Sequence, residues 1–245
     1  MDRSYLSDQT VVEVSRAFVC ARLITFEDSE EAKLMKRLFG SRRLVNTVFT
    51  IMDPKGESSL VRAGRSPSMA FRDAKAMADK MRAVAKRYPG SKKVDADDLG
   101  LPVLEDVRIA LNVTECDAQQ LVILRGDDKQ VKALRKQLTE LSWSDKFIGR
   151  FLYAVADDAT DWGALKGADK APKAGMLIAR SDTYGLTGEV VASAKAGASR
   201  EKLEKVLLAA VEGHKPKAVD TRRLRRQGIR NGVKWQAELP TAKGR

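Results

Sequence analysis

Few side chains in this 245-residue chain have the types and spacing that enzyme chemistry requires. The two cysteines, Cys20 and Cys116, are far apart in the sequence, so the chain has no Cys-x-x-Cys pair for thiol–disulfide exchange. The single histidine, His214, has no cysteine or second histidine at the spacing of a metal site. The sequence therefore predicts no metal centre, and we expect no cofactor.

The two cysteines are expected to be structural or incidental. Cys20 lies between Val19 and Ala21 in an apolar run, where a free cysteine is more typical of a core than of a reactive site. Cys116 lies in a polar segment with a carboxylate on each side and is expected to be a poor nucleophile. Neither cysteine is therefore a candidate catalytic residue.

Two polar clusters have a functional and an ordinary interpretation. Asp127 and Asp128 follow an apolar run and precede Lys129, which is typical of a helix cap rather than of an acid–base pair. Arg65, in Gly-Arg-Ser-Pro before an expected helix, is suited to hold an anion beside the helix N-terminus. A turn followed by a cap is the favoured interpretation there, and both alternatives stay open.

Basic residues are concentrated at the C-terminal end of the chain. The formal net charge is +12, and residues 213–245 contain ten Lys or Arg against Asp220 and Glu238, a net charge of +8. The rest of the chain is close to neutral. The excess of positive charge is therefore a property of this tail.

The tail allows three interpretations. It binds nucleic acid or another anionic surface through its cations, with Trp235 as a stacking platform. Alternatively it is a solubilising, extended or disordered end, which is the favoured interpretation, or it folds over the body of the protein. The candidate binding residues are Arg222, Arg223, Arg225, Arg226, Arg230, Lys234 and Trp235.

The composition is typical of a soluble globular protein, with 43% hydrophobic and 32% charged residues. No stretch reaches the roughly 18–20 apolar residues that cross a bilayer. The first residues contain no apolar core, so they do not predict a secretory signal. We therefore expect a cytoplasmic protein, or a periplasmic one if a signal lies upstream of Met1.

Hydrophobic periodicity predicts a mixed α/β organisation. In the first half we expect a short capped helix after Asp8, a central strand at 17–24, a helix at 27–39 and a strand pair around the turn 53–56. A long helix is then expected from Pro67 to Tyr88. In the second half we expect a bridging helix at 102–111, strands at 120–125, 151–156, 175–180 and 189–193, and helices at 129–141 and 201–211.

Both halves contain the order strand, turn, strand, glycine and amphipathic helix, in residues 46–88 and 175–211. This order resembles the back half of the thioredoxin-like superfamily, particularly bacterial tandem thioredoxin-like proteins. The resemblance implies two tandem thioredoxin-like α/β domains, the first N-terminally incomplete, plus a basic C-terminal extension. The expected divisions are 1–90, a connector and bridging helix at 91–117, a second domain at 118–212, and a flexible tail at 213–245.

The resemblance also implies where a site would lie. The family places Cys-x-x-Cys after a strand, at the position that Gly126-Asp-Asp-Lys occupies here, so Asp127 and Asp128 stand in place of the thiols. A cis-proline borders the family's peptide-binding groove, and Pro172 corresponds to it. In the first half Thr47 takes the place of this proline.

The expected function follows from this resemblance. A thioredoxin fold without its thiols is expected to be a redox-inactive module that binds protein or peptide partners, and so not an enzyme. The alternative is a thiol–disulfide oxidoreductase whose Cys-x-x-Cys segment lies upstream of Met1. Association with nucleic acid or an anionic surface through the tail is the third hypothesis.

Overall fold

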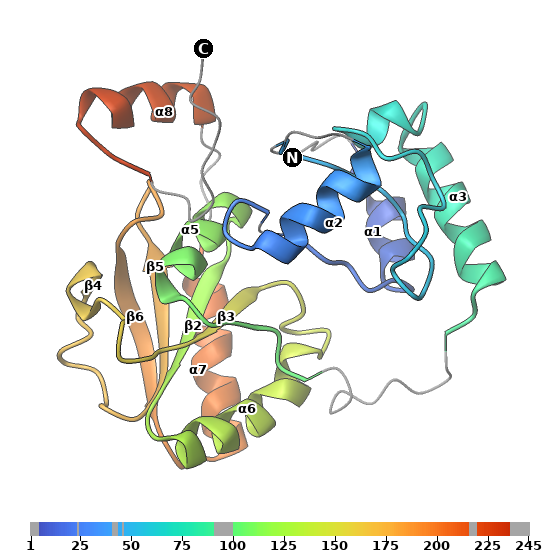
Figure 1. Cartoon of the computed structure of the whole chain (residues 1–245). Helices are drawn as coiled ribbons and strands as arrows, with labels where there is room; N and C mark the ends of the chain where they lie inside the picture. Colours follow the sequence, from blue (N-terminus) through green and yellow to red (C-terminus); the bar gives the residue numbers. More distant parts are fainter. Residues whose placement is uncertain are drawn as a thin grey trace. The chain divides into compact units, whose positions relative to one another are not determined.

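The computed structural model describes residues 5–23, 25–40, 44–45, 47–90, 100–215 and 220–235. These residues fall into two compact units (Figure 1). The N-terminal unit contains the described residues up to Gly90, and the C-terminal unit contains those from Gly100 to Trp235. Each unit has its own buried core, so each is described by itself.

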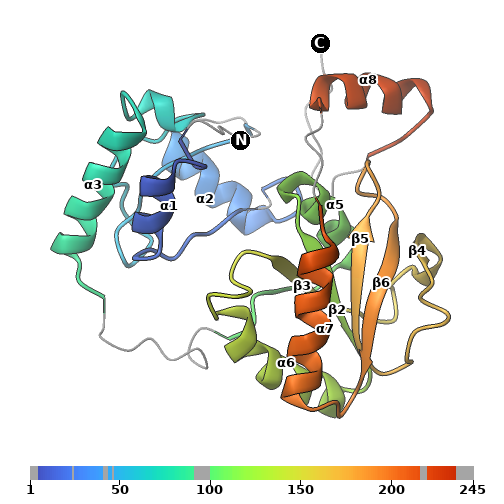
Figure 2. The ribbon, with the colours of Figure 1, turned by 180° about the vertical axis from the view of Figure 1, so that it is seen from behind.

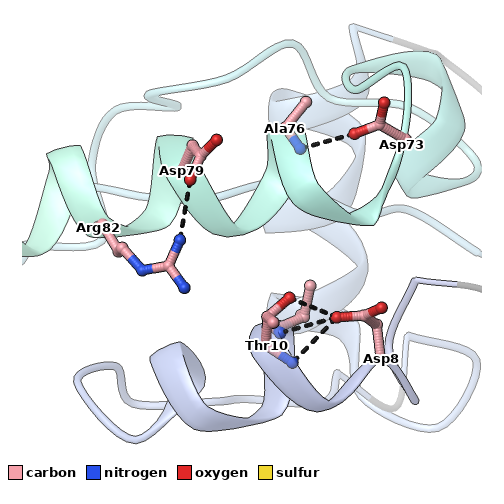
Figure 3. Close-up of polar contacts among 7 residues, drawn as sticks. Asp8, Thr10, Asp73, Ala76, Asp79 and Arg82 are labelled. Carbon is pink, nitrogen blue, oxygen red and sulfur yellow. Dashed lines mark hydrogen bonds and ion pairs between the residues drawn. The ribbon is translucent and has the colours of Figure 1, made fainter.

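The N-terminal unit is built on capped helices, because an aspartate precedes each α-helix and accepts its free N–H groups. Asp8 accepts from the backbone of Thr10 and Val11, and Asp73 accepts from Ala76 at 2.7 Å (Figure 3). Asp79 and Arg82 form an ion pair one turn apart within the third of these helices. The helices are α1 Gln9–Ser15, α2 Ser29–Phe39, the 3-10 helix Pro67–Met69 and α3 Ala74–Arg87.

A small core holds α1 and α3 together. The hydroxyl of Tyr5 donates to the carbonyl of Phe71 at 2.9 Å, which fixes the segment before α1 to the segment before α3. A hairpin covers the core through Ile51, with antiparallel bridges between Phe49 and Gly64 and between Met52 and Ser59. The other buried members of this core are Val11, Met77, Ala78, Met81 and Val84.

Two predictions for the N-terminal unit are wrong. The expected strand at 17–24 is absent from its described residues, Val19 is 83% exposed and Cys20 is exposed, so Cys20 is not a core cysteine. This apolar run has no neighbouring strand to pair with, and β-propensity without a partner does not make a strand. The expected long helix begins at Ala74 rather than at Pro67, because Ser66 and Asp73 each cap a separate helix.

The C-terminal unit contains a six-stranded mixed sheet with the order β1-β3-β2-β5-β6-β4. Strands β2 and β3 are parallel, while β5 is antiparallel to both β2 and β6. The short edge strands β1 and β4 were not predicted. The strands are β1 Val103–Leu104, β2 Gln120–Arg125, β3 Phe151–Val155, β4 Leu165–Lys166, β5 Gly175–Ser181 and β6 Gly188–Lys195.

Helices cover both faces of this sheet, so the central strands are apolar on both sides. One face, with Val122 and Ile178, packs against α6 Asp128–Ser142 and α7 Arg200–Gly213. The opposite face, with Ile123, packs against α5 Val107–Asp117 (Figures 1 and 2). The alternation of side chains along β2 and β5 therefore divides two cores between the faces.

The main elements predicted for this unit are confirmed, with small differences at their ends. Strand β2 has the predicted bounds, and α6, α7, β3, β5 and β6 differ by one or a few residues. The bridging helix is displaced: α5 starts after the capping carboxylate of Asp106 and continues to Asp117. Pro102 is followed by the short strand β1 instead, in keeping with the extended backbone that proline favours before it.

Tyr153 offers a test of packing in this sheet. Its side chain is 3% exposed, and its hydroxyl has no hydrogen-bond partner among the described residues. Because an unpaired buried hydroxyl costs about 1–3 kcal/mol, we expect Tyr153→Phe to raise the free energy of unfolding by about 1 kcal/mol. Urea denaturation at pH 8 measures this difference, and a loss of stability in the variant would contradict the unpaired hydroxyl.

The same residue gives the stability a pH dependence. Burial raises the pKa of the Tyr153 phenol above its ordinary value, so the folded chain keeps the proton where the unfolded chain releases it. Since ionisation then favours the unfolded state, this contribution to stability is present below pH 10 and is lost as the pH rises above about 10. Tyr153→Phe removes this loss, so its advantage over wild type should grow at pH 11.

Candidate functional site

Arg125, the last residue of β2, organises the loop that leads into β5. Its Nε donates to the carbonyl of Pro172 at 2.6 Å. Its Nη2 donates to the carbonyls of Ala168 and Ala171, at 3.1 and 2.7 Å. The guanidinium also lies over the ring of Trp162, 4.7 Å from its centroid. One side chain therefore binds three backbone carbonyls and an aromatic ring of the same loop.

An open groove, here called the Arg125 groove, lies beside this guanidinium. Its cations are Arg125, Lys166 and Lys173, its carboxylate is Asp169, and Lys166 also forms an ion pair with Glu189 at 3.2 Å. Burial lowers the pKa of Arg125, yet a guanidinium so far above neutral pH keeps its charge. The groove is therefore cationic. Its remaining lining residues are Trp162, Gly163, Leu165, Gly167, Ala168 and Ala171.

Asp127 and Asp128 lie where β2 passes into α6, and Asp127 acts as the helix cap. Its carboxylate accepts from the backbone of Gln130 at 2.8 Å, and the Gln130 side chain accepts from the backbone of Asp127 at 3.0 Å. This reciprocal pair is a capping box. The ordinary interpretation of Asp127 is confirmed, and the exposed Asp128 is the first residue of the helix.

Pro172 lies against the same end of the sheet as this turn. Its carbonyl binds Arg125, and two residues later a Cβ on Gly126 would be 3.3 Å from the Cβ of Ala174. The structure therefore brings the segment of Pro172 to the turn that contains Asp127. The described residues contain no cis peptide bond, so the expectation that Pro172 is a cis-proline is wrong.

Thr47 and Arg65 belong to the N-terminal unit and lie at the open end of its hairpin. Thr47 is exposed and precedes the Phe49–Gly64 bridge. Arg65 follows that bridge, and its backbone N–H contacts the sulfur of Met69 at 3.2 Å. The helix beside Arg65 is a single 3-10 turn, which is too short to provide the N-terminal anion site that we hypothesised.

The tail contains a helix, so the prediction of an extended or disordered end is wrong for its described part. Helix α8, Thr221–Arg230, begins at the cap Asp220, whose carboxylate accepts from the backbone of Arg222 and Arg223. These backbone hydrogen bonds, the one from Arg223 first, lower the pKa of Asp220. All five arginines of the candidate set are exposed along this helix, and Lys234 is exposed beyond it.

Trp235 does not offer a free stacking platform, because it packs onto the C-terminal unit. Its Nε1 donates to the carbonyl of Tyr184 at 3.1 Å, and the two rings meet edge to face with centroids 6.0 Å apart. Gly228 is buried at this contact: a Cβ there would be 2.5 Å from Trp235 and 3.1 Å from Tyr184. These contacts attach α8 to the turn between β5 and β6, as the third interpretation of the tail expected.

The sulfur of Cys20 shows no sign of activation. Its S–H lies 4.0 Å from the carbonyl of Ser15, and partial desolvation of the sulfur raises the pKa of the thiol even though the residue is exposed. A raised pKa leaves less of the reactive thiolate at neutral pH. Cys116 is exposed near the C-terminal end of α5. No described cysteine therefore has the environment of a catalytic thiol.

The functional residues that the sequence did not reveal are Arg125 and Trp162. The available signal was a charged residue at the end of an otherwise apolar strand, together with a tryptophan in a polar loop. Within the described ranges, no three His, Cys, Asp or Glu side chains gather as a metal site would require. None of the helices in these ranges is long and apolar enough to cross a membrane.

Comparisons of the chain with protein-family models, with curated proteins and with solved structures found no match in any of the three. What the chain does must therefore be inferred from the geometry of its two units. The Arg125 groove and the arginines of α8 are the two features of the C-terminal unit whose chemistry points to a partner.

Proposed function

We propose that the C-terminal unit is a thioredoxin-like module that binds extended, acidic peptide segments of protein partners without thiol chemistry. The order of its elements supports this proposal. Parallel β2 and β3 are connected through α6, and the antiparallel pair β5 and β6 leads into α7. This is the βαβ and ββα order that the resemblance implies. Because a fold does not determine function, the site must carry the rest.

The contact between the end of β2 and the segment of Pro172 is the observation that carries the function. In the resemblance, the turn after the first strand lies opposite the proline segment, and an extended peptide binds there. In this chain the guanidinium of Arg125 binds the carbonyl of Pro172 at 2.6 Å, beside an open groove. The position that the resemblance assigns to peptide binding thus contains a groove and no sulfur.

The lining of the Arg125 groove determines the class of peptide. Trp162 and Leu165 supply apolar surface, while Arg125, Lys166 and Lys173 supply positive charge against a single carboxylate, Asp169. The donors of Arg125 are engaged with neutral carbonyls, so its charge is not cancelled by a carboxylate. A peptide with an apolar residue next to a glutamate matches both features.

The test uses the full chain and three eight-residue peptides that alternate leucine with glutamate, glutamine or lysine. We expect the glutamate peptide to bind most tightly and to shift the indole N–H signal of Trp162 in an NMR titration. Lys173→Glu reverses one charge of the lining and should weaken this peptide by about tenfold, because close opposite charges contribute on the order of 1 kcal/mol or more.

Lys205→Glu is the matched control, because it makes the same charge change on α7, at an exposed position that does not line the groove. It should leave the affinity for the glutamate peptide unchanged. Absence of binding by all three peptides would contradict the proposal. Equal binding of the glutamate and lysine peptides, or equal losses in the two variants, would contradict the assignment to the Arg125 groove.

A further inference from the structure

Helix α8 concentrates positive charge more strongly than any other helix of the described residues. Five of its ten residues are arginine, none is lysine, and its nearest carboxylate, Asp220, is the cap before its first turn. Since the peptide groove lies elsewhere in the unit, this charge is not explained by the function proposed above.

The arginines are ordered by the helical repeat. Arg222, Arg226 and Arg230 follow at four-residue intervals, so they lie on one face at a rise of about 6 Å from each to the next. Arg223 lies beside them on the same side of the helix. These four side chains are here called the arginine face. Like charges at this spacing destabilise a helix in isolation, whereas a bound anion would stabilise it.

The opposite side of α8 holds the helix in place. Gly228 is buried against Trp235 and Tyr184, and the Trp235 indole donates to the Tyr184 carbonyl at 3.1 Å. All four guanidinium side chains of the arginine face are exposed. Three of them, Arg223, Arg226 and Arg230, line an open groove together with Ile229.

From this geometry we infer that the arginine face binds the phosphate backbone of nucleic acid. Guanidinium groups bind phosphate oxygens with paired hydrogen bonds, which a lysine ammonium cannot match in geometry, and every cation of this helix is an arginine. Regularly spaced cations on a rigid face suit a polymer of regularly spaced phosphates. Contacts of this kind carry no base preference.

A membrane surface fits the same helix less well. A helix that lies in a lipid interface needs a broad apolar face to bury there. The apolar side of α8 contains Gly228, which is already covered by Trp235 and Tyr184, and Ile229 is the one large hydrophobic residue of α8 that is exposed, at 56%. Positive charge without a free apolar face favours phosphates in water over phosphates in a bilayer.

The test measures fluorescence anisotropy of a labelled 20-nucleotide DNA, single-stranded and duplex, with the full chain at several salt concentrations. In the test variant all four residues of the arginine face are changed to glutamine, which keeps the helix propensity. The slope of log affinity against log salt should become shallower by about 3 for the single strand, because each phosphate that is no longer neutralised removes about 0.7. Affinity at low salt should fall on the order of a hundredfold.

The matched control changes four exposed cations elsewhere in the same unit to glutamine, so that the net charge falls equally: Lys132, Lys136, Arg150 and Lys205. This control should keep most of the affinity and the salt slope. Equal losses in both variants would reduce the effect to net charge and overturn the inference, as would unchanged binding in the test variant. Binding to phosphatidylserine vesicles but to neither DNA would overturn it in favour of a membrane surface.

Discussion

Gly175→Ala is expected to lower the free energy of unfolding of the C-terminal unit by about 4 kcal/mol. Gly175 has φ +146°, a conformation that side-chain-bearing residues rarely adopt, which alone costs about 1–3 kcal/mol. A Cβ there would also lie 2.0 Å from the carbonyl oxygen of Ala194 and 2.9 Å from the backbone nitrogen of Ala196. Because both atoms are backbone, β6 would have to move, which adds a cost of about 1–3 kcal/mol.

Tryptophan fluorescence during urea denaturation measures this loss for the correct unit. The three tryptophans of the chain, Trp143, Trp162 and Trp235, all lie in the C-terminal unit. Gly197→Ala is the matched control, because Gly197 also has a positive φ, +80°, but open space around its Cβ position. We expect this control to lose about 1–2 kcal/mol from the backbone conformation alone.

The difference between these two variants isolates the clash from the backbone strain. If Gly175→Ala lost no more stability than Gly197→Ala, the pairing of Gly175 with Lys195 would not be as close as the structure places it. The same outcome would weaken the Arg125 groove, since Gly175 begins the strand that follows the Pro172 loop.

The two units show how far periodicity in the sequence predicts structure. In the C-terminal unit, the apolar runs of β2 and β5 predict buried strands because each run has neighbours to pair with. In the N-terminal unit, the apolar run around Cys20 meets no sheet, and Val19 and Cys20 are exposed. Strand propensity is therefore predictive only when partners exist elsewhere in the chain, and this information is nonlocal.

The candidate site divides in the same way. Asp127 is predictable as a cap because its partner, Gln130, is three residues away. The bond from Arg125 to Pro172 joins residues 47 positions apart, so no local pattern contains it. Helix α8 had a local signal in its cap Asp220, which the high charge of the tail concealed, and the contact of Trp235 with Tyr184 had none.

Arg125→Met is expected to release the loop between β3 and β5. The guanidinium donates to three carbonyls of this loop and stacks on Trp162, and hydrogen bonds from charged groups contribute about 1.5–3 kcal/mol each without being additive. Methionine keeps apolar bulk next to the ring but donates nothing. We therefore expect the free energy of opening the loop to fall by about 2 kcal/mol.

Limited proteolysis with trypsin reports this opening directly, because Lys170 lies within the loop that Arg125 holds. When opening is fast relative to cleavage, the cleavage rate follows the open population, so cutting after Lys170 should accelerate roughly thirtyfold. Arg125→Lys should open almost as readily, since an ammonium cannot reproduce the geometry of the fork. Arg150→Met, which removes an exposed arginine of the same unit, should leave the rate unchanged. An unchanged rate in Arg125→Met would mean that the loop keeps its shape without the guanidinium, and the Arg125 groove would then depend on Trp162 and the backbone alone.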